Sequence, residues 1–116
     1  MALDALDTVD IIEQLENFID TIRPVDEEIR KKLDFGYNID NQSIILVQIR
    51  PDWKNPQIFH QSPFAKMTYV KASDKWKIYW MRSNGNWDPY EPAPTVKSLK
   101  GALEIIRDDK HHAFFG

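Results

Sequence analysis

Residues 64–90, FAKMTYVKASDKWKIYWMRSNGNWDPY, decide the fold of this chain. Apolar and polar residues alternate along 64–71 and again along 75–82, and a period of two is typical of half-buried β-strands. The Ala-Ser-Asp segment between the two runs favours a turn, because Ser and Asp side chains bond the neighbouring backbone. The stretch therefore predicts two antiparallel strands joined by a tight turn.

The two faces of the second predicted strand differ in character. One face carries large apolar side chains, and the other carries cations and a phenol. The apolar face consists of Trp76, Ile78 and Trp80, and the opposite face of Lys75, Lys77, Tyr79 and Met81. We expect helices to cover the tryptophans, and we expect the lysines to face solvent.

A second turn is predicted at Asn84-Gly85. Asn-Gly supplies the positive φ angles that a two-residue hairpin turn needs. We expect the next strand to run from Trp87 to Tyr90. Pro89 has no N–H to donate, so this strand must lie at a sheet edge or end at the proline.

Two further strands are predicted on the N-terminal side. Apolar residues alternate along 35–39, and residues 43–50 are almost continuously apolar, which indicates a central strand. The prolines of residues 52–63 predict a long loop, in which Ile58 and Phe59 extend the strand pairing briefly. Loops of this length are often functional or mobile.

Helices are expected at both ends of the chain. Residues 8–22 place apolar side chains at helical spacing, and a second short helix over 24–33 would complete a helical hairpin. Ser98 is expected to cap a last helix, inside which Gly101 marks a close contact with the sheet. The terminal pair Phe114-Phe115 is expected to be tucked against the domain.

The predicted fold class is therefore α+β in one domain. It comprises an N-terminal helical hairpin (8–33), a five-stranded antiparallel meander sheet (34–91) and a C-terminal helix (95–110) packed on one face. The chain of 116 residues is long enough for a single domain, 1–116.

Composition excludes several classes of function. The chain contains no cysteine, which excludes disulfides, cysteine–zinc sites and thiol catalysis. No apolar run approaches the ~20 residues of a membrane helix. We therefore expect a cytoplasmic protein that has no contact with membranes.

Charge is distributed unevenly. Residues 1–34 carry ten acidic and four basic residues, whereas residues 64–83 carry five basic residues and one acidic residue. One interpretation is that both sets are simply solvated. The other is a basic sheet face that binds an anionic partner, either an acidic protein or a nucleic acid.

On the second interpretation the protein is a non-catalytic binding domain. Lysines and a tyrosine on the open face would meet the ligand, and arginines and tryptophans near strand ends would form a rim. The candidate binding residues are Arg50, Trp53, Lys66, Lys77, Tyr79, Arg82 and Trp87. The alternative for Trp53 and Trp87 is that both indoles close the ends of the core.

Other chemistry has weaker support in the sequence. The three histidines, His60, His111 and His112, lack the spacing of a metal site, and no phosphate-binding glycine loop occurs. We therefore expect no metal and no cofactor, and we assign no catalytic residue. Two alternatives remain open. One is a hydrolase-like enzyme that uses Asp88, Glu91 or His60 near Trp53 and Tyr90. The other is a structural subunit that forms a homodimer through the first helix.

The chain also resembles a known family. The residues that carry the resemblance are Arg50-Pro51-x-Trp53, Ala65-Lys66, Tyr69-Val70-Lys71, Trp76-Lys77-Ile78-Tyr79-Trp80 with Arg82, Trp87, Tyr90-Glu91-Pro92, Val96-Lys97-Ser98-Leu99 and Phe114-Phe115-Gly116. They are similar to the bacterial family called domain of unknown function 3024 (DUF3024). The resemblance covers nearly the whole chain. It implies one small bacterial domain and transfers no activity and no catalytic residue.

Overall fold

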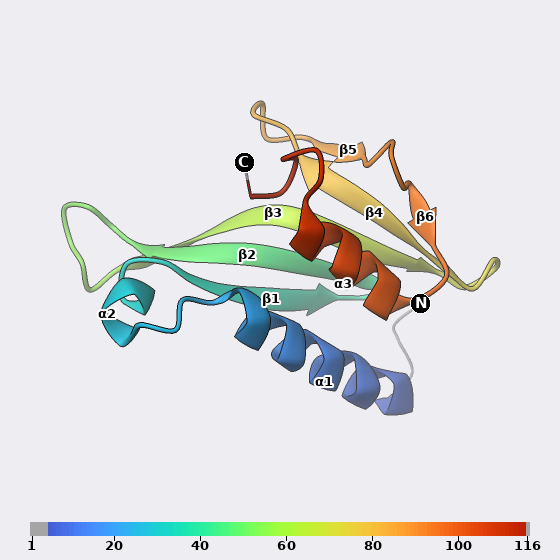
Figure 1. Cartoon of the computed structure of the whole chain (residues 1–116), viewed down its shortest axis with the longest axis horizontal. Coiled ribbons are helices and arrows are strands. Elements are labelled where there is room, and N and C mark those ends of the chain that lie inside the picture. Colours follow the sequence, from blue (N-terminus) through green and yellow to red (C-terminus); the bar gives the residue numbers. More distant parts are fainter. Residues whose placement is uncertain (1–4, 116) are drawn as a thin grey trace.

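The protein is an α+β structure with an antiparallel sheet and helices at both ends of the chain (Figure 1). The computed structural model describes residues 5–115, with side chains from residue 8 onward. In chain order the elements are α1 (Ala5–Ile22), α2 (Glu27–Arg30), β1 (Asp34–Asp40), β2 (Ser43–Pro51), β3 (Phe59–Val70), β4 (Lys75–Met81), β5 (Trp87–Pro89), β6 (Thr95–Val96) and α3 (Leu99–Asp108).

The sheet has one more strand than the sequence predicted. The strands follow the order β1-β2-β3-β4-β5, and β6 also pairs with β4. Between β5 and β6 the chain bulges away from β4. Two backbone bonds to Ile78 still connect that segment to β4: Tyr90 N–H donates to Ile78 O at 2.9 Å, and Pro94 O accepts from Ile78 N–H at 3.1 Å. Proline nitrogens cannot donate to the ladder, so Pro92 and Pro94 favour this interruption.

β3 begins earlier than predicted. It starts at Phe59, so the predicted loop over 52–63 is in fact a shorter loop followed by five residues of strand. The pairing with β2 shifts register between Leu46 and Val47, where Phe64 is the extra residue of a β-bulge. Pro63 stands beside this bulge, one of the few places where a strand inside a sheet tolerates a missing N–H.

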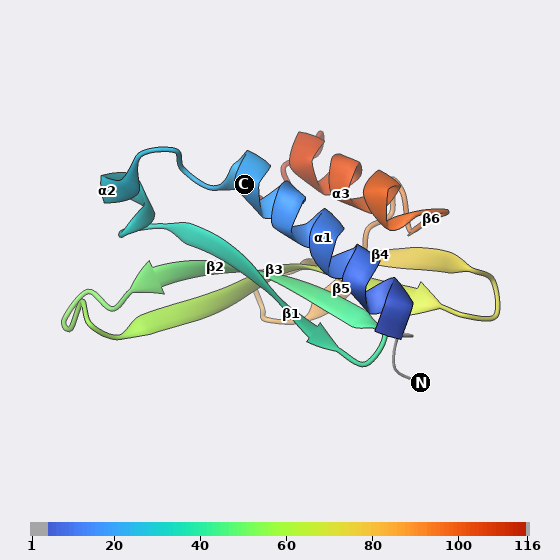
Figure 2. The same ribbon diagram turned by 90° about the horizontal axis from the view of Figure 1, so that it is seen from below.

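The core lies between the sheet and two helices. α1 and α3 lie on the same side of the sheet (Figure 2), and their buried side chains share one cluster with Trp76 and Ile78 of β4. Trp80 is half-buried against the same cluster. The fully buried large side chains are Leu15, Ile44, Leu46, Met67, Ile78 and Ile106.

The short helices and turns differ from the predictions in detail. α2 is a single turn, capped where Asp26 accepts from Glu28 N–H at 2.9 Å, instead of a helix over 24–33. Ser98 caps α3 as predicted, accepting from Gly101 N–H at 3.0 Å. Gly101, however, faces its own cap and not the sheet, because a Cβ added there would lie 3.2 Å from Ser98 Oγ.

The turn between β4 and β5 is wider than the predicted two-residue form. Of its residues only Gly85 has a positive φ, at 84°, while Asn84 does not. Gly85 N–H donates to Arg82 O at 2.9 Å, and Arg82 N–H donates to Asn86 O at 2.9 Å. This is the pattern of a type I turn followed by a glycine bulge, which needs only one left-handed residue.

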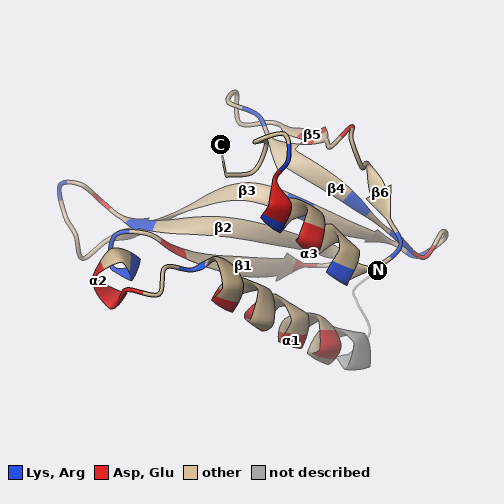
Figure 3. Ribbon diagram, viewed as in Figure 1, with Lys and Arg blue, Asp and Glu red and all other residues tan. Residues whose placement is uncertain are grey.

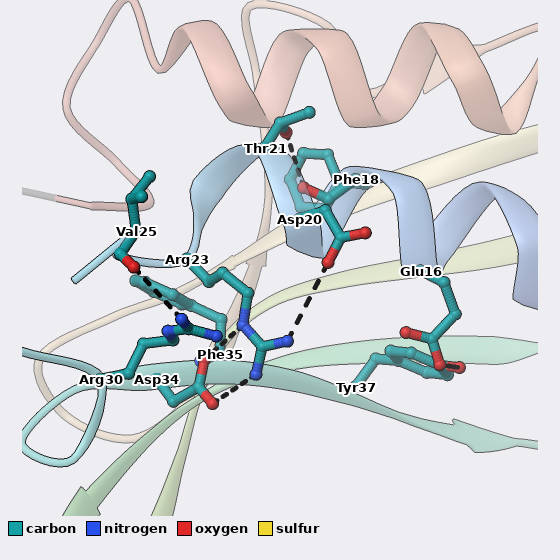
Figure 4. Close-up of polar contacts among 10 residues, drawn as sticks. All are labelled: Glu16, Phe18, Asp20, Thr21, Arg23, Val25, Arg30, Asp34, Phe35 and Tyr37. Carbon is teal, nitrogen blue, oxygen red and sulfur yellow. Dashed lines mark hydrogen bonds and ion pairs between the residues drawn. The ribbon is translucent and has the colours of Figure 1, made fainter. Parts of the chain in front are cut away.

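An ion pair joins the end of α1 to the start of β1 (Figure 4). Arg23 donates from Nε to Asp34 Oδ1 at 3.1 Å and from Nη2 to Asp34 Oδ2 at 2.5 Å. Partial burial would raise the pKa of Asp34. The bonds from Arg23, together with one from Phe35 N–H, outweigh this effect and hold the pKa below its ordinary value of 3.8.

This ion pair predicts a specific pH dependence of stability. A depressed carboxyl pKa stabilises the fold above pH 3.8, and the contribution disappears as the pH falls through the lower folded pKa. Arg23→Gln is expected to lower the free energy of unfolding by about 1 kcal/mol near neutrality. That difference should shrink as the pH falls below 3.8. Urea denaturation across pH measures it, with Arg107→Gln on α3 as a control, and a pH-independent difference would contradict the assignment.

Candidate functional site: the open face of the sheet

One face of the sheet is covered by no helix of residues 5–115 (Figure 2). Directly opposed residues of an antiparallel pair share a face, so the register identifies its side chains. On β3 and β4 the opposed pairs on this open face are Lys66–Tyr79 and Thr68–Lys77. Trp76, Ile78 and Trp80 belong to the other, helix-covered face. The lysines therefore look away from the core, as the alternation in the sequence predicted.

A lysine on the open face contacts two aromatic rings. Lys66 Nζ lies 4.7 Å from the ring centroid of Tyr79 and 5.2 Å from the ring centroid of Trp87. Tyr79 stands directly opposite Lys66 in the sheet, and Trp87 stands one strand further on, opposite Met81. All three side chains are half-buried. Each cation–π contact contributes about 0.5–1 kcal/mol at a surface site, so the two contacts favour this position of the ammonium.

An apolar strip continues this face across β2. Val47 is 3% exposed although no described helix covers it. Asn38 Nδ2 donates to Gln61 Oε1 at 3.2 Å, a bond that joins the strands on either side of β2. Gly36, opposite Val47, leaves room for its neighbours, since a Cβ there would lie 3.2 Å from Ile49 Cδ1. Val47 is therefore buried by its own strand neighbours and presents almost no surface to a ligand.

Residues 3–116 match a family described as a domain of unknown function. The chain belongs to this family, DUF3024. No curated protein and no solved structure matches the DUF3024 chain.

Arg82 of the DUF3024 chain does not join the open face. Its Nη1 lies 3.3 Å from Asp88 Oδ2, and Asp88 is directly opposite the core-facing Trp80. Arg82 is thus engaged on the helix-covered side, at the rim of the sheet. Lys77 remains on the open face, opposite Thr68.

Arg50 and Trp53 lie far from Lys66. Arg50 is five residues along β2 from Ile45, the residue opposite Lys66, which corresponds to about 16 Å at 3.3 Å per residue. Trp53 follows in the β2–β3 loop and is 84% exposed. The alternative that Trp53 closes the core is therefore wrong. Trp87, half-buried on the open face, is also outside the core cluster.

The residues of the alternative enzyme site are only partly together. Asp88 and Glu91 line a cavity of about 420 Å³ with Tyr90, His111 and His112. Neither His60 nor Trp53 is part of its lining, because His60 Nε2 lies 2.9 Å from Asp52 Oδ1 beside the β2–β3 loop. Asp88 is the carboxylate that pairs with Arg82.

The described part of this DUF3024 chain offers neither a metal site nor a membrane-spanning helix. From residue 8 onward, no group of three or more His, Asp or Glu side chains is arranged to hold a metal ion. Among the helices described, none combines the length and the apolarity needed to cross a membrane. Acidic residues recur along α1 (Figure 3), which packs on the face of the sheet opposite to that of Lys66.

Proposed function

We propose that the open face binds single-stranded nucleic acid as a non-catalytic module. The observation that carries the proposal is the Lys66 ammonium in contact with both the Tyr79 and Trp87 rings on a sheet face without a helix over it. Single-strand binding surfaces combine cations for the phosphates with aromatic rings on which bases stack, and each stacked base contributes about 1–3 kcal/mol. On this face the Lys66 cation and the two aromatic rings lie within one side-chain length of one another.

Charge separation supports the same function. The acids of α1 lie on the opposite side of the sheet, so they do not oppose a polyanion that approaches Lys66 and Lys77 (Figure 3). An acidic protein would use the cations but would gain less from two neighbouring rings.

Binding of a short fluorescein-labelled oligothymidylate, followed by anisotropy, tests the proposal. The logarithm of the binding constant should fall linearly with the logarithm of salt concentration, because bound phosphates release counterions. Lys66→Ala and Trp87→Ala should each weaken binding about tenfold, and Lys110→Ala, which removes an exposed lysine outside the sheet, should not. Thermal denaturation of each variant shows whether it is folded.

Heparin separates nucleic acid from other polyanions, since it carries charge without bases. Heparin that binds as tightly as the oligonucleotide, with no loss in Trp87→Ala, would replace the proposal with simple anion or acidic-protein binding. Affinity for the oligonucleotide that is constant across salt would contradict it outright.

A further inference from the structure

Most of the large apolar side chains that the fold leaves in water lie at one end of the molecule, where α2 and the β2–β3 hairpin meet (Figure 1). Of the seven exposed ones in the described part of the chain, two are on α1. The other five are Val25, Ile29, Trp53, Ile58 and Phe59. Single exposed apolar residues are normal, but a concentration of them is typical of an interaction site.

A cleft of about 520 Å³ joins α2 to the hairpin at this end. Ile49 and Phe59 give it an apolar wall, and Glu27, Arg30 and Lys31 bring charges of both signs. A lining of mixed charge does not select a strongly acidic or a strongly basic partner. It suits a partner that itself carries both signs in a matching order.

The charges around α2 are arranged in such an order. Residues 26–32 read Asp-Glu-Glu-Ile-Arg-Lys-Lys, which is three acids, then Ile29, then three bases (Figure 3). Ile29, at the centre, is 52% exposed. If two such segments lie antiparallel about a twofold axis at Ile29, each acid of one copy faces a base of the other. A twofold contact uses the same patch on both copies, so the patch must be complementary to itself, as this one is.

The charged side chains are free to make these contacts. Lys31 Nζ lies 3.1 Å from Glu28 Oε1, but the two side chains are 70% and 79% exposed. An exposed pair of this kind contributes little to stability, so exchanging it for a pair with another copy costs little.

The exposed apolar surface at this end is also large enough for a dimer contact. The five side chains together expose on the order of 500 Å², compared with roughly 800 Å² of total surface that each partner buries in a standard interface. The acids and bases of residues 26–32 would supply the polar rim.

The helix that the sequence suggested for a homodimer is less suited to one. Val9 and Ile12 of α1 are exposed, but residues 8–22 contain four acids and no base. Two copies of α1 side by side would bring carboxylates together, and like charges at an interface oppose association.

We infer that the α2 end binds a second copy of the chain in a twofold-symmetric dimer. The α2 segments would lie antiparallel with the two Ile29 side chains in contact, and each would cover the apolar wall of the other copy's cleft. The Lys66 face lies elsewhere on the sheet, and the inference does not depend on the proposed function.

Sedimentation velocity of the full chain over a concentration series tests the inference. The natural protein should form a dimer with a Kd of about 1–100 μM, as suits an interface below standard size. Ile29→Ser and Phe59→Ser should each raise the Kd about tenfold, and both should fold normally because each side chain is more than half exposed. Val9→Ser, which removes an exposed apolar side chain of α1, is the matched control and should leave the Kd unchanged.

A charge exchange tests the antiparallel arrangement itself, in which Glu27 of one copy faces Lys31 of the other. Glu27→Lys and Lys31→Glu should each raise the Kd about tenfold, because each sets like charges opposite one another at two places in the dimer. An equimolar mixture of the two variants should form a heterodimer of nearly natural affinity, because opposite charges meet again at both places. Glu104→Lys, at an exposed position of α3, should neither weaken the dimer nor restore it in a mixture. Thermal denaturation shows whether each variant is folded.

Three results would overturn the inference. One is a protein that stays monomeric up to about 1 mM. Another is a dimer that persists in Ile29→Ser and is lost in Val9→Ser, which would place the interface on α1. The third is a failure of the mixture to restore the dimer, which would mean that the charge order serves only the helix dipole. Oligonucleotide binding should be unchanged in Ile29→Ser, so failure here is distinguishable from failure of the proposed function.

Discussion

Asp109→Ala is expected to lower the free energy of unfolding by about 3 kcal/mol, because one buried carboxylate holds the C-terminal tail. Asp109 is 8% exposed, and it accepts from Phe114 N–H at 3.0 Å and from Phe115 N–H at 2.8 Å. A hydrogen bond to a charged group contributes about 1.5–3 kcal/mol. Alanine would leave both N–H donors without this acceptor.

The tail that Asp109 holds closes one end of the core. The ring of Phe114 lies 4.9 Å from that of Tyr90, and the ring of Phe115 lies 5.1 Å from that of Phe64. Burial, followed by the charge of Asp109, raises the pKa of Tyr90, which fits a phenol enclosed by this tail. Loss of the carboxylate should therefore release both phenylalanine rings together.

Two substitutions of Asp109 show how much the acceptor oxygen and the backbone conformation each matter. Asp109 has φ 42°, in the left-handed region, which Asn tolerates better than Ala. Asn also keeps one acceptor oxygen, so Asp109→Asn should cost less than Asp109→Ala. Asp108→Ala, at the exposed neighbouring position, is the matched control and should change stability by less than about 0.5 kcal/mol.

A double-mutant cycle separates tail docking from a local effect on α3. If Asp109 acts by holding the tail, Phe114→Ala should cost much less in the Asp109→Ala background than in the natural protein. Urea denaturation of the four proteins measures this coupling. Additive costs would mean that Asp109 stabilises the end of the helix independently of the phenylalanines.

Much of the fold could be predicted because its signals are local. Alternation along 75–82 identified the two faces of β4, and apolar side chains at helical spacing along 8–22 identified α1. Ser98 was identified by its capping chemistry alone. Each of these signals depends on residues within one or two turns of one another, so no knowledge of pairing is needed.

The missed features depend on pairing between strands. The bulge at Phe64, the early start of β3 and the short β6 follow from the register against neighbouring strands, which the sequence does not encode locally. The Asn84-Gly85 turn was located correctly, but its type depends on the twist of the flanking strands. α2 is shorter than the helix predicted over 24–33 and ends after one turn.

The residues of the candidate site also fall into two groups, those that local alternation could place and those whose positions depend on strand pairing. Lys66 and Tyr79 could be placed on one face by alternation, and Trp87 joins them because β5 pairs with the end of β4. Arg50 and Trp53 share the chemistry of that group but lie at the far end of the β2–β3 hairpin. Composition identifies residue types suited to binding, whereas only the register shows which of them meet.

Ile78→Ala is expected to lower the free energy of unfolding by about 2–5 kcal/mol, because it opens a cavity at the centre of the core. Ile78 is fully buried and stands opposite Met67, which is also fully buried. Its backbone also carries the two bonds that hold the segment between β5 and β6. Ile78→Val, which removes one methylene group, should cost about 0.5–1.5 kcal/mol.

Lys77, the residue next to Ile78 on β4, is the control, because its side chain lies on the opposite face of the sheet. Lys77 is exposed on the open face, so Lys77→Ala should change stability by less than about 0.5 kcal/mol while weakening oligonucleotide binding. Ile78→Ala should do the reverse, lowering stability without a direct effect on affinity at temperatures where it stays folded. Similar stability losses in both variants would mean that a partner element covers the lysine face, and no free surface for a nucleic acid would then exist.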